Sequence, residues 1–170
     1  MAFNLRRFFH ERCAFPFDWW ITNDSNGFAQ FLVDLDVEKL YNPNQLRLTD
    51  DSRAIVHETY RLELYHEFPR VSSEENAVIA SDYLLSTSFA RRRTLYLINR
   101  LKALGQDGSR ILFIRATEHC EVISAALRKS FSGVNWDLAF LGRVYRDGFD
   151  WRGDPGVWDR TLQGLGVTRR

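Results

Sequence analysis

A strand–helix–strand pattern in the second half of the chain constrains its fold more than any other feature. Residues 110–115 form a short apolar run of the kind that makes a buried strand. Residues 118–129 have the apolar spacing of a helix, and residues 136–141 form a second apolar run. Two strands joined through a helix favour a parallel crossover. We therefore expect an α/β fold, with three layers and a mostly parallel sheet.

Length and composition favour one packed domain. The chain has 170 residues, of which 45% are hydrophobic, and this is enough for one core. No internal repeat or long linker divides the sequence, so we expect a single domain over residues 1–170. Residues 3–12 have a helical pattern that no capping residue or turn introduces. This abrupt beginning predicts that the domain lacks its first strand.

Two segments in the middle of the chain have clear periodicity. Residues 54–68 alternate between apolar and polar side chains, which predicts one continuous strand with His57 on the polar, rim-like phase. Its apolar face would consist of Tyr60, Leu62, Leu64, His66 and Phe68. Ser72 and Glu75 can form a capping box, which predicts a helix running from there, with a break near residues 86–88, to a stop at Gly105. The turn cluster at residues 23–27 can cap a helix that begins at Phe28, and residues 42–44 predict a break after it.

Charge and targeting signals limit the partners and the location of the protein. The formal net charge is +1, so the chain lacks the positive field with which nucleic-acid-binding proteins attract phosphates. No apolar stretch reaches the length of a signal peptide or the roughly 20 residues of a membrane span. We expect a cytoplasmic protein with no nucleic-acid or membrane partner, in which Cys13 and Cys120 are reduced thiols.

Cofactor motifs do not occur in the sequence. It contains no Gly-rich phosphate loop, no HExxH and no CxxC. His66, Glu118, His119 and Cys120 could supply metal ligands, but their spacing matches no known ligand pattern. We expect neither a cofactor nor a metal ion.

The aromatic segment Phe-Pro-Phe-Asp-Trp-Trp at residues 15–20 is the most informative local motif. Pro16 excludes helix interior, so residues 13–22 are expected to form a strand edge or a fixed loop. A carboxylate between bulky aromatic side chains is costly to bury unless it is paired. Asp18 therefore either seals the loop through an ion pair with a nearby arginine or belongs to a functional site.

Cys13, His66 and Asp18 are the first candidate catalytic residues. A thiolate attacks carbonyl carbon well when a neighbouring base lowers the pKa of the thiol, and a carboxylate can orient the imidazole. Structural alternatives stay open, because Cys13 can be a small buried residue and His66 a hydrogen-bonded core histidine. A second candidate is Cys120 in the first turn of the predicted helix, where ordinary capping by Thr117 is the competing interpretation.

Several segments together resemble a bacterial family of unknown function described as papain-like cysteine peptidases. The resemblance rests on Ala-Phe-Asn-Leu-Arg-Arg at residues 2–7, Pro-Phe-Asp-Trp at 16–19, His-Glu-Phe at 66–68, Arg-Arg-Arg at 91–93 and Leu-Phe-Ile-Arg at 112–115. It implies that His66 is the catalytic histidine and that Asp18 is the aspartate beside tryptophan. It also implies an α+β, papain-like architecture as the alternative to the parallel α/β fold.

The resemblance places the nucleophile in a Leu-Gly-x-x-Cys-like segment that would lie just before Met1. We therefore expect the family's first strand and its cysteine to be absent from this sequence, and Cys13 is not the matched cysteine. The expected activity is that of a thiol-dependent hydrolase acting on a peptide or another acyl substrate, inactive as it stands unless Cys13 substitutes. The alternative is a non-enzymatic α/β binding module for glycans of the cell surface, with Trp19, Trp20 and Trp151 as flat stacking surfaces.

Overall fold

The computed structural model describes residues 16–17, 20–22, 24–71, 77–115, 121–140 and 154–167. The chain divides into two compact units. The sheet unit comprises Phe15–Ala103 and Glu121–Ser132, and the strand-pair unit comprises Met1–Ala14, Leu104–Cys120 and Gly133–Arg170. The helix predicted over residues 3–12 lies outside the described residues. The single-domain assignment stays a prediction.

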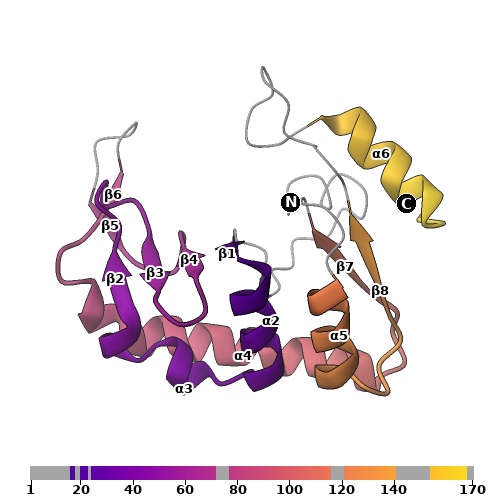
Figure 1. Ribbon diagram of the computed structural model, residues 1–170, viewed down its shortest axis with the longest axis horizontal. Coiled ribbons are helices and arrows are strands. Elements are labelled where there is room, and N and C mark those ends of the chain that lie inside the picture. Colours follow the sequence, from indigo (N-terminus) through magenta and orange to yellow (C-terminus); the bar gives the residue numbers. More distant parts are fainter. Residues whose placement is uncertain are drawn as a thin grey trace. The chain divides into compact units, whose positions relative to one another are not determined.

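The main sheet has four short strands in the order β1-β4-β3-β2, and every neighbouring pair is antiparallel (Figure 1). The strands are β1 (Trp20–Thr22), β2 (Leu46–Leu48), β3 (Ile55–His57) and β4 (Leu62–Leu64). The expected mixture of helices and strands is confirmed, but the prediction of a mostly parallel sheet is wrong. The physical reason is the connections: β2, β3 and β4 follow one another through short turns, which can join only antiparallel neighbours.

The predicted continuous strand over residues 54–68 is a hairpin instead. It turns at residues 58–61, where Arg61 has a φ of 55°, and then bends again over residues 65–68 after β4. Tyr60, Leu62 and Leu64 are buried as the alternation predicts, because the period of two survives through the strand itself. The bend ends that alternation, since it changes the direction in which the following side chains point.

The helices of the first half begin at side-chain caps. Asp24 accepts from the backbone N–H groups of Asn26 and Gly27 and so begins α2 (Ser25–Asp34). Asp36 begins α3 (Val37–Leu40) in the same way, and the predicted break follows as η1 (Pro43–Gln45). The turn cluster at residues 23–27 therefore does introduce a helix, three residues earlier than residue 28.

The segment after Pro69 differs from the prediction of one long helix. It first forms a two-stranded antiparallel hairpin, β5 (Arg70–Val71) and β6 (Val78–Ile79), and then η2 (Tyr83–Ser86). The long helix α4 (Thr87–Gln106) begins only at the point where the sequence predicted a break. The capping box of Ser72 and Glu75 lies outside the described residues.

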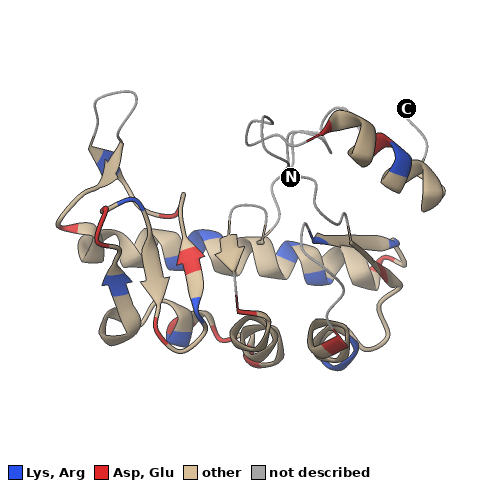
Figure 2. Ribbon diagram, turned by 45° about the horizontal axis from the view of Figure 1, so that its top comes forward, with Lys and Arg blue, Asp and Glu red and all other residues tan. Residues whose placement is uncertain are grey.

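The core of the sheet unit lies between the antiparallel sheet and the helices. Ala90 and Ile98 of α4 belong to one buried cluster with Ile55, Leu62 and Leu64 of the sheet. On the other flank, α5 (Glu121–Ser130) lies beside α2 (Figure 1), and the Ser130 hydroxyl donates to the Leu32 carbonyl at 2.5 Å. The charged residues of α4 are all basic, whereas the other α-helices of this unit carry acidic residues (Figure 2).

The strand-pair unit contains the parallel pair that the sequence predicts. β7 (Ile111–Arg115) and β8 (Trp136–Phe140) run parallel, with Phe113 opposite Leu138. Asp154 caps α6 (Pro155–Gly164), whose Trp158 is fully buried. Its neighbours are Leu112, Ile114, Val157, Leu162 and Val167. In the described part of the chain, no helix is both long and apolar enough to cross a membrane.

Candidate functional site

His66 is the one predicted catalytic residue that the described structure contains, because Cys13 and Asp18 lie outside the described residues. His66 lies in the bend that follows β4, and its side chain is exposed. The expectation that it shares the apolar face of a strand is therefore wrong. The bend exposes His66 and buries the next residue, Glu67, which reverses the order that the alternation predicted.

Glu67 lies at the centre of a small polar group that we call the Glu67 cluster, formed by Trp20, Glu67 and Arg93. The indole Nε1 of Trp20 donates to Oε1 of Glu67 at 3.2 Å. A guanidinium nitrogen of Arg93, on α4, lies 3.7 Å from Oε2. No donor among the described residues is within hydrogen-bonding distance of Oε2. The cluster thus ties β1, the bend after β4 and helix α4 to one buried carboxyl group.

Burial dominates the electrostatics of the Glu67 cluster. It raises the pKa of Glu67, and the opposing effects of Arg93 and the Trp20 hydrogen bond are smaller. Tyr41 is close enough for the charge of Glu67 to act on it: burial first, and Glu67 second, raise the pKa of Tyr41. The Tyr41 hydroxyl is 2.7 Å from that of Thr94 on α4. The cluster therefore favours a carboxyl group that holds its proton more tightly than usual.

His66 has an environment that favours its neutral form. Partial burial lowers the pKa of His66, and the positive charges of Arg70 and Arg93 lower it further. Its ring packs edge-to-face against Tyr65, with ring centroids 5.2 Å apart. A neutral imidazole at pH 7 can accept a proton, as a general base must.

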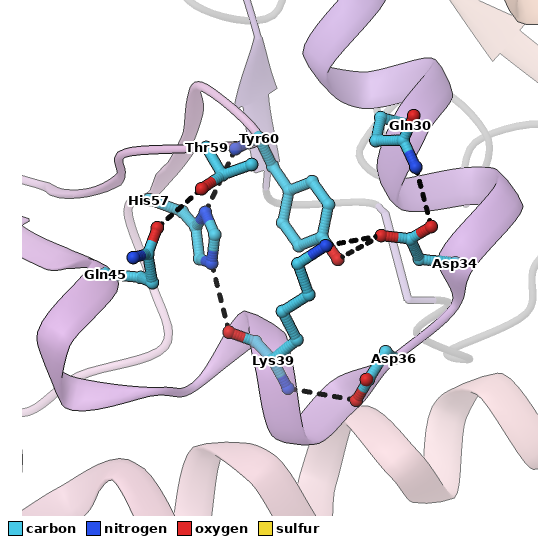
Figure 3. A network of polar contacts seen from close by, with 8 residues as sticks. All are labelled: Gln30, Asp34, Asp36, Lys39, Gln45, His57, Thr59 and Tyr60. Carbon is cyan, nitrogen blue, oxygen red and sulfur yellow. Dashed lines mark hydrogen bonds and ion pairs between the residues drawn. The ribbon is translucent and has the colours of Figure 1, made fainter.

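His57, expected at a rim position, is instead buried in the core of the sheet unit (Figure 3). Its Nδ1 accepts from the Tyr60 backbone N–H at 3.0 Å, so Nε2 carries the proton and donates to the Lys39 carbonyl at 3.1 Å. The ring also stacks on Tyr60, with ring centroids 4.4 Å apart. Burial lowers the pKa of His57. Both nitrogens are engaged, so His57 has a structural role.

The same network continues to Asp34 at the end of α2 (Figure 3). Its carboxylate accepts from Lys39 Nζ at 2.9 Å, from the Tyr60 hydroxyl at 2.8 Å and from Gln30 at 2.7 Å. The hydrogen bond from Lys39 is the main cause that lowers the pKa of Asp34. The network joins α2, α3 and the β3–β4 hairpin.

The structure describes only some of the other candidate residues. Thr117, Cys120, Trp19 and Trp151 lie outside the described residues. Trp20 is described, and it is half-buried against Phe31 with ring centroids 5.1 Å apart. Its ring also packs against Phe17, with ring centroids 5.5 Å apart, and its N–H donates to Glu67. Within the described ranges, no three His, Cys, Asp or Glu side chains gather as metal ligands.

Sequence reasoning did not identify the Glu67 cluster as a unit, although its residues lie in segments that had been singled out. Trp20 ends the aromatic segment, Glu67 follows His66, and Arg93 closes the Arg-Arg-Arg run. These three segments thus meet at one carboxyl group. One sequence signal points to this cluster: Glu67 is a charged residue at the end of a strand-like pattern, two residues before Pro69.

Comparison with known proteins adds no relative. No family model matches the chain, and no curated protein or solved structure is significantly similar to it.

Proposed function

We propose that this protein is a thiol-dependent acyl-transfer hydrolase, peptidase-like and cytoplasmic, in which His66 is the general base. Cys13 is the proposed nucleophile and Asp18 the residue that orients the imidazole. His66 takes the thiol proton as the sulfur attacks the substrate carbonyl carbon, and it returns that proton to the leaving group. Water then hydrolyses the thioester and restores the thiol.

One observation carries this proposal: the register between β1 and β4. Trp20 is paired with Leu64, and the strands are antiparallel. Asp18 precedes Trp20 by two residues, and His66 follows Leu64 by two residues. Along the chain, both residues therefore come just outside the last pair of this ladder, Trp20 and Leu64, at the same end of the two strands. This supports a site to which both Asp18 and His66 contribute.

The Glu67 cluster gives this site a second support. The hydrogen bond from Trp20, the first residue of β1, to Glu67 joins that strand to the bend that follows β4. It holds the backbone beside His66 to the segment that carries Asp18. The neutral state of His66 suits a general base, because only the neutral imidazole can accept the thiol proton.

Hydrolysis of p-nitrophenyl acetate tests the proposal. Cys13→Ser and His66→Gln should each lower the rate of the full chain about 100-fold or more, the usual contribution of a nucleophile or general base. Cys120→Ser and His119→Gln are the matched controls and should keep the wild-type rate. Acetylation of Cys13, found by peptide mass spectrometry, should disappear in Cys13→Ser. Equal rates in all four variants would contradict the proposal.

A further inference from the structure

Arg70, on β5, makes an unusual set of contacts around the bend that carries His66. One guanidinium nitrogen donates to the Ala77 carbonyl at 2.7 Å. The other donates to the Arg53 carbonyl at 2.7 Å and also to the Tyr65 carbonyl. One side chain thus ties β5 to the backbone just before β6, the backbone before β3 and the bend after β4.

Arg70 contacts Tyr65 in two ways. Besides the carbonyl hydrogen bond, the guanidinium group lies over the Tyr65 ring, 4.5 Å from its centroid. The edge of that ring in turn packs with His66. The chain of contacts therefore runs from Arg70 through the Tyr65 ring to the imidazole, and the Tyr65 carbonyl fixes the backbone one residue before His66.

The contacts of Arg70 act on the His66 side of the bend, whereas Trp20 and Arg93 hold the bend through Glu67. Residues 65–68 belong to no strand or helix, so the ladder bonds that hold β4 end before His66. The hydrogen bond from Arg70 to Tyr65 closes a loop of the chain in which His66 lies. The planar guanidinium fork can hold three carbonyls and stack on a ring at the same time, which a lysine ammonium cannot.

From this geometry we infer that Arg70 is a positioning residue for His66: it fixes the orientation of the imidazole through Tyr65 and places a permanent positive charge beside it. This inference rests on the proposed role of His66 as the base. The charge favours the neutral imidazole, which agrees with the lowered pKa of His66.

NMR titration of His66 in the full chain separates this role from a merely structural one. In Arg70→Gln the pKa of His66 should rise, because one positive charge is removed. In Arg70→Lys the charge stays, so the pKa should change less, but the ring-current shift that Tyr65 imposes on His66 should diminish. Arg47→Gln is the matched control, since Arg47 pairs with Glu58 and is not among the charges that act on His66. It should change neither quantity.

A measurement on the wild type covers the case in which Arg70→Gln does not fold. Raising the salt concentration screens the charges of Arg70 and of Arg93, Arg70 having the larger effect, so the pKa of His66 should increase with salt. Tyr65→Leu keeps Arg70 and should abolish the ring-current shift. Two results together would overturn the inference: a pKa of His66 that does not change with salt, and His66 resonances that are unchanged in folded Arg70→Lys and Tyr65→Leu.

The two proposals can fail separately. If wild-type hydrolysis of p-nitrophenyl acetate depends on His66, Arg70→Lys should slow it by up to about 100-fold, the loss expected for a reactive group misplaced by an ångström. If hydrolysis does not depend on His66, the proposed function fails, and the NMR measurements still decide whether Arg70 positions the ring.

Discussion

Gly27→Ala should destabilise the protein, although helix propensity alone predicts the opposite. Gly27 lies in the first turn of α2, and alanine is favoured over glycine inside a helix by about 1 kcal/mol. A Cβ at position 27, however, would lie 2.2 Å from the Tyr60 carbonyl oxygen and 2.7 Å from its carbonyl carbon. Both atoms belong to the backbone, so no side-chain rotation can relieve the overlap.

The size of the effect follows from these distances. A carbon and a carbonyl oxygen normally stay about 3.3 Å apart or more, so α2 and the β3–β4 hairpin must separate by about 1 Å. Overpacking of this kind costs about 1–3 kcal/mol, and a rigid backbone obstacle belongs at the upper end. After the propensity gain, we expect a net loss of about 2 kcal/mol, which for a chain of this length lowers Tm by about 4–8 °C.

Thermal unfolding followed by circular dichroism measures this change. Gly164→Ala is the matched control, because Gly164 is also helical and a Cβ added there would meet no atom within 4 Å outside its own stretch of helix. That variant should melt at the wild-type temperature or slightly above it. If Gly27→Ala were as stable as Gly164→Ala, the close approach of α2 to Tyr60 would be refuted.

Three further predictions concern buried His57, buried Glu67 and the core around Trp158 in the strand-pair unit. The folded pKa of His57 is below its usual 6.5, so the unfolded chain binds more protons than the folded chain in acid. Urea denaturation should therefore show that the free energy of unfolding falls as the pH drops through 6.5. His66→Gln, which removes a second histidine whose pKa is lowered, should keep the part of this pH dependence that His57 causes. Glu67 should give the opposite pH dependence, because its raised pKa means that stability is lost as the pH rises through the folded pKa. Between pH 4 and pH 8, Glu67→Gln should therefore become more stable relative to the wild type. A difference in stability between the two proteins that does not change with pH would contradict the buried carboxyl group. Trp158→Ala should cost about 3–5 kcal/mol by cavity formation, measured by calorimetry, whereas exposed Tyr96→Ala should cost little.

Much of the local structure follows from the sequence alone. The turn cluster with Asp24 caps α2, the break near Pro43 is present, and the apolar runs at 110–115 and 136–141 form a parallel pair. These features depend on short-range causes, namely side-chain caps, the fixed φ of proline and the periodicity of apolar residues. Such causes act within a few residues of the chain.

The candidate site could be predicted only as a set of residue types. His66, Asp18 and Cys13 follow from chemistry and resemblance, but the alternation of residues 54–68 placed His66 inside and Glu67 outside. The structure reverses both positions because the chain bends after Leu64. The residues before the bend keep their alternation of two, so the pattern itself gives no sign that a bend follows. The exposed base and the buried carboxyl could not be distinguished from periodicity.

What the sequence determined by itself is the mixture of helices and strands, the turn cluster that begins α2, the parallel pair of β7 and β8, and buried positions such as Leu62 and Leu64. Only the tertiary structure decided that the main sheet is antiparallel, that His57 is buried, and that Trp20, Glu67 and Arg93 meet. The physical reason is that strand pairing and contacts such as that between Trp20 and Glu67 join residues far apart in sequence, whereas propensity and periodicity record only the local environment.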